Sequence, residues 1–384
     1  MKRLLVLAVA LLALGLLLAG CGGSKEEKAE KVLKIGTMSP LTGPYAADGN
    51  DIRQGAEIAV EVFNEAGGIP GFSKIEIIPE DTACDPKQAV AAANKLINEK
   101  VTAVVGAYCS SSTIPASETL AEENIFMLTP ASTSPKVTER GLKYMFRTCG
   151  RDDHQAPAAV KFMKDVEGVK TIFIVDDKTT YSQGLAEGVA AAAEAAGIKV
   201  LEHDHVNQGD KDYSAVLTKV KAANPDLFYI SLQNSATGAL MVIQAKRMGI
   251  NAILMGQDAV YHPKLIEIAK GDAEGMFCTF GDIDKDAPKY KEFQAKYKAK
   301  TGNEPGAYSA YAFDSATAYL MAVKDAGTTD PAKVRDALLK LDFTGASKQV
   351  KYQENGDSGS NYTVYKIQDG KFVPYWNSLT GKKY

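Results

Sequence analysis

Apolar and polar residues alternate in blocks along most of the chain. Short apolar runs, rich in β-branched and aromatic residues, alternate with longer amphipathic segments rich in alanine. The apolar runs lie at 32–38, 74–81, 101–108, 171–177, 226–232 and 252–256, and the amphipathic segments lie near 51–66, 86–99, 115–124, 183–196, 236–248 and 263–270. Strands of this apolar character, separated by helices of about 10–15 residues, are typical of parallel sheets covered by helices on both faces. The pattern therefore predicts an α/β protein.

The alternation is interrupted twice, at RTCGRDD (147–153) and at MFCTFGDID (276–284). A long helical region is expected at 287–326, and the pattern becomes strand-like again after about 350. There the turn QDGK predicts a β-hairpin, because Asp-Gly suits a two-residue turn. A chain of 384 residues exceeds what one compact core usually supports. We interpret the two interruptions as crossings between two lobes.

The N-terminus has the organisation of an export signal. Lys2 and Arg3 precede a long apolar run that ends in LAGC. A basic start, an apolar core and small residues at the end are typical of a signal peptide, predicted here at 1–20. LAGC resembles the bacterial lipobox, which implies cleavage before Cys21 and lipidation of its sulfur. Residues 21–31 are expected to form a flexible tether. The alternative is a signal anchor that is never cleaved.

Composition narrows the class of protein. Hydrophobic residues make up 45% and charged residues 24%, and the formal net charge is −3. These values fit a soluble globular protein and give no support to nucleic-acid binding. Four cysteines remain after Cys21, namely Cys84, Cys109, Cys149 and Cys278. In an exported chain they permit disulfides, and spacing alone leaves three pairings open.

Two clusters of hydroxyl side chains each follow a predicted strand. We call CSSST (109–113) the first hydroxyl loop and TPASTSP (129–135) the second hydroxyl loop. The simpler interpretation is that one hydroxyl caps a helix beginning near Pro115 and the others are solvated. The alternative is that hydroxyls and free backbone N–H groups bind an anion at the carboxyl edge of a sheet. We expect the two loops to meet at that edge, which favours the anion site.

Longer segments carry a resemblance to a known family. The stretches 80–96 and 104–135, extended by 64–71, 147–155, 176–188 and 254–260, resemble the leucine/isoleucine/valine-binding proteins of bacterial ABC transporters. The resemblance covers the chain from Val32 onward. It implies the type I periplasmic binding fold, with two Rossmann-like lobes joined by three crossovers and closing on an amino acid. Lobe 1 is expected to comprise 32–148 and 283–359, and lobe 2 is expected to comprise 149–282 and 360–384.

The resemblance also implies roles for individual residues. Ser110 and Thr133 are expected to bind the ligand α-carboxylate, and the Ala131 carbonyl with the Thr133 hydroxyl is expected to receive the α-ammonium. Tyr181 matches an aromatic residue that closes the cleft, and Tyr308 matches one near the ligand side chain. The alternatives are an exposed loop tyrosine at 181 and an ordinary core tyrosine at 308.

Three positions depart from the family pattern. Asp258 stands where a glutamate normally pairs with the ammonium, and Asp48 and Gln233 each replace an aromatic residue. Burying an unpaired carboxylate against an aliphatic side chain would cost roughly several kcal/mol of desolvation free energy. We therefore expect the ligand side chain to be polar rather than branched aliphatic. The alternative is that Asp48 points to solvent at the rim of the cleft.

The resemblance assigns a disulfide to Cys84 and Cys109. Cys149 and Cys278 lie in the two segments interpreted as crossings, which run side by side in the family fold. We predict a second disulfide between them. The alternative is a pair of buried free thiols.

No motif of a hydrolase, metalloprotease or nucleotide-binding enzyme is present in the sequence. His203 and His205 alternate near a strand end, where such residues are usually solvated, so no metal and no cofactor are expected. We predict a monomeric, lipid-anchored, extracytoplasmic protein that binds an amino acid and serves an ABC transporter permease. The alternatives are a ligand-sensing module for a membrane receptor and a hydrolase using Ser110.

Overall fold

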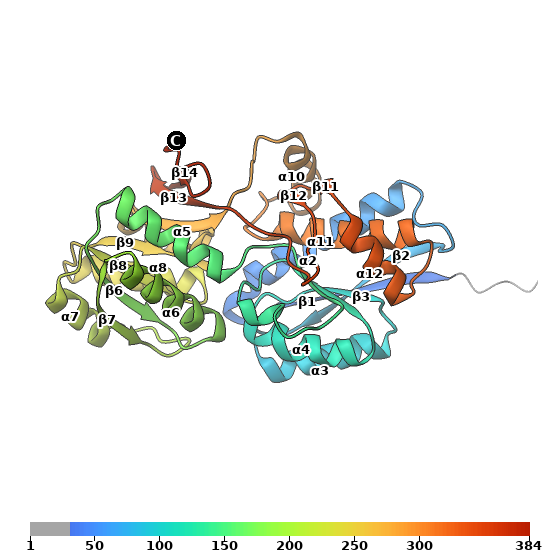
Figure 1. Ribbon diagram of the computed structural model, residues 1–384, viewed down its shortest axis with the longest axis horizontal. Helices are drawn as coiled ribbons and strands as arrows, with labels where there is room; N and C mark the ends of the chain where they lie inside the picture. The colour runs from blue at the N-terminus through green and yellow to red at the C-terminus, as the bar shows by residue number, and fades with distance from the viewer. Residues whose placement is uncertain (1–30) are drawn as a thin grey trace, which may run out of the picture.

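The computed structural model describes residues 31–384, so the predicted signal peptide, Cys21 and nearly all of the predicted tether lie outside the described residues. The described chain forms two lobes side by side, each built around its own β-sheet (Figure 1). Among residues 31–384, no helix is both long and apolar enough to cross a membrane.

The first lobe contains a five-stranded parallel sheet in the order β2-β1-β3-β4-β5. Its strands are β1 (Val32–Ser39), β2 (Lys74–Asp81), β3 (Ala103–Gly106), β4 (Phe126–Thr129) and β5 (Met145–Arg147). Its helices are α2 (Ala46–Glu65), α3 (Pro86–Asn98), α4 (Ser110–Glu122), α10 (Pro288–Thr301), α11 (Ser309–Ala326) and α12 (Pro331–Lys340). Short 3₁₀ helices η1 (Gly43–Tyr45) and η2 (Pro135–Val137) and a small ladder of β11 (Phe343–Thr344) and β12 (Gln349–Val350) complete it.

The second lobe contains a seven-stranded mixed sheet in the order β14-β13-β10-β9-β8-β6-β7. Its strands are β6 (Thr171–Asp176), β7 (Lys199–His205), β8 (Leu227–Ser231), β9 (Ile253–Gly256), β10 (Phe277–Gly281), β13 (Tyr362–Gln368) and β14 (Lys371–Asn377). Its helices are α5 (Asp152–Asp165), α6 (Thr180–Ala195), α7 (Ser214–Ala223), α8 (Ser235–Arg247) and α9 (Pro263–Ala269), with 3₁₀ helices η3 (Asp258–Val260) and η4 (Lys270–Ala273). Strand β13 is antiparallel to both of its neighbours, β10 and β14, and the other pairs of this sheet are parallel. The chain crosses between the lobes after β5, after β10 and after β12.

Strands covered on both faces explain the continuous apolar runs in the sequence. In β6, Ile172 and Ile174 pack in the core under α5 and α6, whereas Phe173 and Val175 pack in the core under α7 and α8. Successive side chains of a strand point to opposite faces, so both sets must be apolar. The first sheet is likewise covered by α2, α11 and α12 on one face and by α3 and α4 on the other. The predicted α/β architecture is confirmed.

The predicted C-terminal hairpin is also confirmed. Strands β13 and β14 pair in register up to Gln368 and Lys371, which leaves Asp369 and Gly370 as the two turn residues. Both have positive φ, 52° and 67°. A tight two-residue turn of this kind needs positive φ at both positions, which explains the choice of Asp-Gly.

The long helical region expected at 287–326 is instead two helices, α10 and α11. Gly302 ends α10 in the left-handed conformation, with φ of 74°, and Pro305 lies in the loop that follows. These two residues stop the helix. The loop between α10 and α11 carries Tyr308 toward the other lobe, where its hydroxyl contacts Asp258.

Cys84 and Cys109 form the disulfide that the resemblance implied. The predicted bridge between Cys149 and Cys278 is wrong, because both are buried free thiols. Cys278 lies within β10, between β9 and β13, rather than in a crossing segment, which starts only after Gly281. The Cys149 thiol donates instead to the Ser132 carbonyl at 3.8 Å.

Replacing Cys84 and Cys109 together by serine should lower the free energy of unfolding by about 3.5 kcal/mol, because the open loop gains chain entropy in the unfolded state. The loop spans a sequence separation of 25 residues. Urea denaturation measures the change. Wild-type protein unfolded under reductant should match the double variant, and equal stability of oxidised wild type and variant would contradict the prediction.

Candidate functional site

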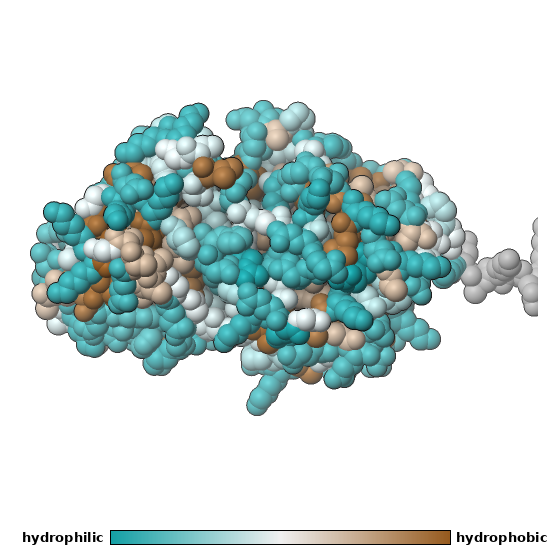
Figure 2. Space-filling model, viewed as in Figure 1, coloured by the Kyte–Doolittle hydropathy of each residue, from teal (hydrophilic) through white to brown (hydrophobic). Residues whose placement is uncertain are grey.

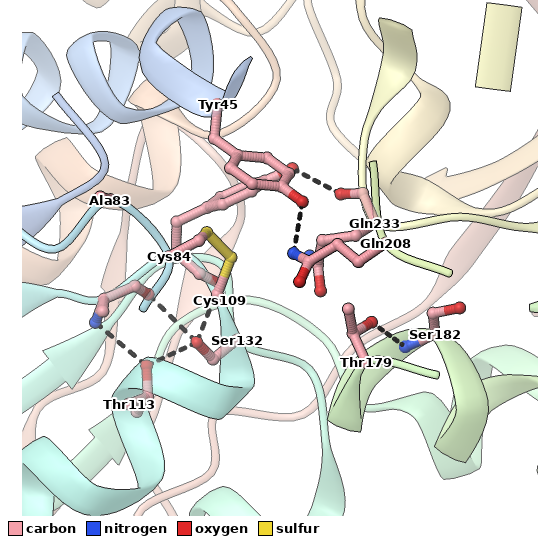
Figure 3. Close-up of a disulfide and its surroundings, with 12 residues drawn as sticks. Tyr45, Ala83, Cys84, Cys109, Thr113, Ser132, Thr179, Ser182, Gln208 and Gln233 are labelled. Carbon is pink, nitrogen blue, oxygen red and sulfur yellow. Dashed lines mark hydrogen bonds between the residues drawn. A yellow bond between two sulfur atoms is a disulfide. The ribbon is translucent and has the colours of Figure 1, made fainter. Parts of the chain in front are cut away.

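The two hydroxyl loops meet at the carboxyl edge of the first sheet, as the sequence predicts. Thr113 and Ser132 join their hydroxyls at 2.6 Å, and the Ser134 N–H donates to the Ser110 Oγ at 3.4 Å. The Ser132 hydroxyl also contacts the carbonyls of Ala107 and Tyr108. These bonds hold the loops as one polar surface. The disulfide lies beside it and ties the start of the first hydroxyl loop to the loop after β2 (Figure 3).

Helix α4 begins at Ser110, not near Pro115 as expected. The Cys109 carbonyl accepts the N–H groups of Ser112 and Thr113, and Pro115 lies inside the helix. The hydroxyls are therefore in the first turn, and none of them caps the helix in the usual way. Because the first N–H groups of a helix have no intrahelical acceptor, this turn is suited to an anion.

A buried arginine that was not predicted from the sequence supports the second hydroxyl loop. Arg147 is fully buried, and its Nη1 donates to the carbonyls of Ser132 and Ser134 at 3.2 and 2.7 Å. Its Nε donates to Asp357 at 2.7 Å, and Asp357 also accepts from Arg151. The arginine thus fixes the loop carbonyls and links them to the third crossing. Its motif, RTCGRDD, was visible in the sequence, but its partner lies 210 residues away.

The second lobe faces these loops with residues from three strand ends. Tyr181 lies in the first turn of α6, which follows β6, and Gln233 and Asp258 follow β8 and β9. All three are buried. Parallel strands end at one edge of a sheet, so three separate loops converge there.

Asp258 is the centre of a hydrogen-bond network of neutral donors. Its carboxylate accepts from the Tyr181 hydroxyl at 2.5 Å, from Gln155 Nε2 at 2.9 Å and from the Tyr308 hydroxyl at 3.1 Å. Burial raises the pKa of Asp258 above its ordinary value, and these donors only partly offset the rise. A positive charge would stabilise this carboxylate further. Gln155 was not predicted, although it lies in a segment that carries the resemblance.

Tyr308 reaches Asp258 from the first lobe. Its loop is held by Asp51 of α2, whose carboxylate accepts the N–H groups of Gly306, Tyr308 and Ser309 at 2.8–2.9 Å. Its phenol therefore connects the lobes directly, in a position fixed by the backbone.

One small cavity lies between the lobes at this point, with a volume of about 10 Å³. It is lined by Tyr108, Ser110, Ala131, Tyr181, Gln233, Asp258, Ala259 and Tyr308. Six of the predicted ligand-binding residues are among them, and Tyr108 and Ala259 were not predicted. Thr133 and Asp48 lie nearby but do not line it.

Thr133 and Asp152 are buried next to this cavity. In residues 31–384, the Thr133 hydroxyl and both Asp152 carboxyl oxygens form no hydrogen bond. The two residues are adjacent, because the Asp152 N–H donates to the Thr133 carbonyl at 3.0 Å. Burial, and next the negative charge of Asp258, raises the pKa of Asp152 well above its ordinary value, and the neighbouring Thr133 side chain offsets only part of this rise. Unpartnered buried polar atoms are costly, so these groups are available to a polar ligand.

Asp48 does not point to solvent at the rim, as one alternative held. It is 4% exposed, and its Oδ1 lies 4.0 Å from His262 Nε2 across the lobe boundary. Burial raises the pKa of Asp48 to about 6, although the nearby His262 acts in the opposite direction.

Direct contacts join the lobes around the cavity. Gln208 Nε2 donates to the Tyr45 hydroxyl at 2.5 Å (Figure 3). The Tyr108 hydroxyl donates to the Gln233 carbonyl at 3.5 Å. Tyrosines from the first lobe thus contact polar groups of the second lobe.

A second, larger cavity of about 350 Å³ lies beside Tyr308 and also spans both lobes. Its walls include Tyr261, Phe280 and Phe372, with Lys285 at its edge. The smaller cavity is the better candidate for an amino acid head group by its chemistry, because hydroxyls and a carboxylate converge there, whereas aromatic side chains dominate the larger one. Its volume of about 10 Å³ is that of a single water molecule, so the lobes must separate further to admit a ligand.

The chain is similar to known proteins in both sequence and fold. A family model described as periplasmic binding protein matches residues 32–371. The leucine-, isoleucine-, valine-, threonine- and alanine-binding protein of Pseudomonas aeruginosa is 38% identical over 350 residues, covering 91% of this chain and 93% of that protein. The crystal structure of the leucine-binding protein LivK from Thermotoga maritima has a TM-score of 0.84 at 31% identity and covers 90% of this chain and 98% of that one. The isoleucine complex of the substrate-binding protein LivJ from Streptococcus pneumoniae has a TM-score of 0.82 at 26% identity and covers 89% and 98%.

Proposed function

Because the chain belongs to the periplasmic binding protein family, and within it to the branched-chain amino acid binding proteins, we propose that it captures an amino acid between its lobes for an ABC importer. Its fold is the type I periplasmic binding fold, and it is a binding protein rather than an enzyme. The observation that carries the proposal is the cavity in which hydroxyls of one lobe face the Asp258 carboxylate of the other.

The polar ends of the ligand are assigned to opposite sides of this cavity. Ser110 and Thr133, with the free N–H groups of the first turn of α4, bind the α-carboxylate. The Ala131 carbonyl and the Asp258 carboxylate accept from the α-ammonium. Two observations support this division. The Thr133 hydroxyl is buried without a hydrogen bond in the described chain, and Asp258 has only neutral partners.

Closure follows from the same contacts. The first lobe supplies the carboxylate site, whereas Tyr181, Gln233 and Asp258 of the second lobe add contacts only when the lobes approach. A ligand shifts the open–closed equilibrium only through such additional contacts. Tyr308 stays with the first lobe and bonds to Asp258 on closure, so it helps to define the closed state.

We propose a polar side chain for the ligand. Gln233 lines the cavity, and Asp48, Asp152 and Asp258 concentrate carboxyl groups around it. A second candidate is a small aliphatic amino acid, because the Pseudomonas aeruginosa relative is named for leucine, isoleucine, valine, threonine and alanine. The two candidates differ in what must lie next to Asp48.

A binding panel separates these candidates. We expect calorimetric titration with leucine, threonine, glutamine and arginine to give tighter binding for the polar or cationic ligands, because Asp48 is buried. Asp48→Asn should change the ranking among ligands and leave the common head-group affinity in place. Tight, leucine-preferring binding by the wild type would contradict the polar assignment while preserving the proposed function. No binding of any amino acid would overturn both.

The cellular setting is the remaining part of the proposal. Membership of the family makes the protein extracytoplasmic. We propose that Cys21 is lipidated after removal of residues 1–20 and that residues 21–31 tether the lobes to the membrane. We also propose that lobe 1 comprises 32–148 and 283–359, and that lobe 2 comprises 149–282 and 360–384. The closed monomer would then dock on the permease. On the face drawn in Figure 2, apolar residues form small separate patches, which supports a monomer.

Two other functions were considered from the sequence. A sensing module for a membrane receptor would bind its ligand in the same way. Inspection of the neighbouring genes for a permease, followed by pull-down with any permease found there, distinguishes it from a transporter component. A hydrolase using Ser110 is excluded by the family assignment. The Ser110 hydroxyl accepts from a backbone N–H rather than contacting an imidazole.

A further inference from the structure

A compact group of metal-ligating side chains lies outside the amino acid site. Asp176 ends β6, and His203 and His205 lie on β7, the outer strand of the second sheet (Figure 1). His203 Nε2 and His205 Nδ1 lie 2.6 and 2.8 Å from the same Asp176 oxygen, Oδ2. One ligand atom from each residue falls within 4.8 Å of the others. The alternation of His203 and His205 is visible in the sequence, but the contact of both rings with Asp176 is set by strand pairing.

Backbone pairing brings the three side chains together. Strands β6 and β7 are parallel neighbours, and Asp176 is directly opposite His205 in their register. His203 and His205 are two residues apart on a strand, so they point to the same face. The other Asp176 oxygen, Oδ1, accepts the Lys178 N–H at 2.8 Å. The Lys178 N–H therefore orients the carboxylate independently of the histidines, as hydrogen bonds to the outer atoms of metal ligands commonly do.

The donor set suits a borderline divalent cation. Two imidazole nitrogens and one carboxylate oxygen are a common set of three protein ligands for Zn²⁺, with a fourth position left for water. With metal–ligand bonds of about 2.0–2.1 Å, tetrahedral geometry separates ligand atoms by about 3.3 Å. Each imidazole would thus move away from the Asp176 oxygen by less than roughly 1 Å. His203 is half-buried and His205 is exposed, so their rings have room for this adjustment.

The surrounding charges permit a cation here. Asp176 is fully buried and supplies one negative charge. The neighbouring cation Lys219 is held by Glu202 and Asp204 at 3.1 and 2.8 Å, so its charge is neutralised. Lys178 directs its ammonium to Asn207 at 3.4 Å. Without a metal, the two imidazoles share one acceptor oxygen, and a metal would satisfy all three groups at once.

We propose that Asp176, His203 and His205 form a binding site for a divalent transition metal of the Zn²⁺ class, distinct from the amino acid site. The metal would join the outer strand β7 to β6. The site is one residue from Asp177, whose carboxylate accepts the Gln233 N–H at 2.7 Å. It therefore lies at the edge of the second lobe that faces the ligand.

Titration calorimetry with ZnCl₂ tests the proposal. The sample is the chain without residues 1–20, treated with EDTA and then dialysed. We expect one zinc ion per chain, and Co²⁺ substitution should give the visible absorption of a tetrahedral site. His203→Ala and His205→Ala should each weaken zinc binding at least about tenfold, since each removes one of three ligands. His154→Ala, which changes an exposed histidine outside the cluster, is the matched control and should bind zinc as the wild type does.

Two results would overturn the proposal. One is the absence of zinc binding and of cobalt absorption at millimolar metal. The other is zinc binding that survives unchanged in the His203→Ala and His205→Ala variants, which would place the metal elsewhere on the chain. Circular dichroism of each variant establishes that it is folded, and since both histidines lie at the surface, the test does not depend on replacing the buried Asp176.

Discussion

Thr133→Ala weakens binding of every amino acid ligand by about 10- to 150-fold, because the hydroxyl is proposed to bond to the charged head group common to all of them. Hydrogen bonds to charged groups contribute about 1.5–3 kcal/mol each. The Thr133 hydroxyl is buried and forms no hydrogen bond in residues 31–384. Calorimetric titration with the preferred ligand and with weaker ligands measures the loss, which should be uniform across the series.

The same variant separates a binding role from a structural one. Since the hydroxyl forms no hydrogen bond in residues 31–384 and only moderates the raised pKa of the adjacent Asp152, its removal should leave the Tm of the ligand-free protein nearly unchanged. Thr119→Ala is the matched control, because its hydroxyl bonds to the Pro115 carbonyl within α4. Thr133→Ser should recover most of the affinity. An unchanged affinity in Thr133→Ala would show that the head-group assignment is wrong.

The sequence predicted best those elements whose conformation depends on neighbouring residues in the chain. The run 74–81 matches the bounds of β2, and the Asp-Gly turn falls where the sequence expected it. A strand between two helical layers must be apolar on both faces, and a two-residue turn needs particular residues. In contrast, β10 was mistaken for a crossing. Its residues, FCTFG, include a cysteine and a glycine, and only pairing with β9 and β13 makes them a strand.

The site divides in the same way. Ser110, Ala131, Tyr181, Gln233, Asp258 and Tyr308 were expected from the resemblance to the family, and the structure brings them around one cavity. Arg147 and Gln155 were missed because their partners come from distant segments. Gln155 donates to Asp258 from 103 positions away, and Arg147 pairs with Asp357 in the third crossing. No residue pattern near either side chain indicates such a contact, so only the folded arrangement identifies it.

The second large effect is expected at Asp258. Asp258→Asn keeps the size of the side chain but removes the charge that is proposed to pair with the ligand ammonium. Removing one partner of a buried, hydrogen-bonded charge pair costs about 2–5 kcal/mol. The affinity should therefore fall by about 30- to 5,000-fold, and calorimetry measures it. Asp314→Asn is the matched control. It changes a carboxyl that is equally buried but is bound to Ala346 and Ser347 away from the cavity.

The pH dependence gives an independent test of the same charge. Burial raises the pKa of Asp258 in the folded protein, so its carboxylate lowers stability at neutral pH, and this effect disappears as the pH falls below the ordinary range of an aspartate. The ligand ammonium favours the ionised form, and protons therefore compete with the ligand. Wild-type affinity should decline as the pH is lowered, and Asp258→Asn should show a flatter profile together with a higher Tm of the ligand-free protein at pH 7. Equal pH profiles for wild type and variant would show that the ligand ammonium pairs with a group other than Asp258. Asp152 would then be the next residue to replace, since its carboxyl oxygens are buried beside the same cavity.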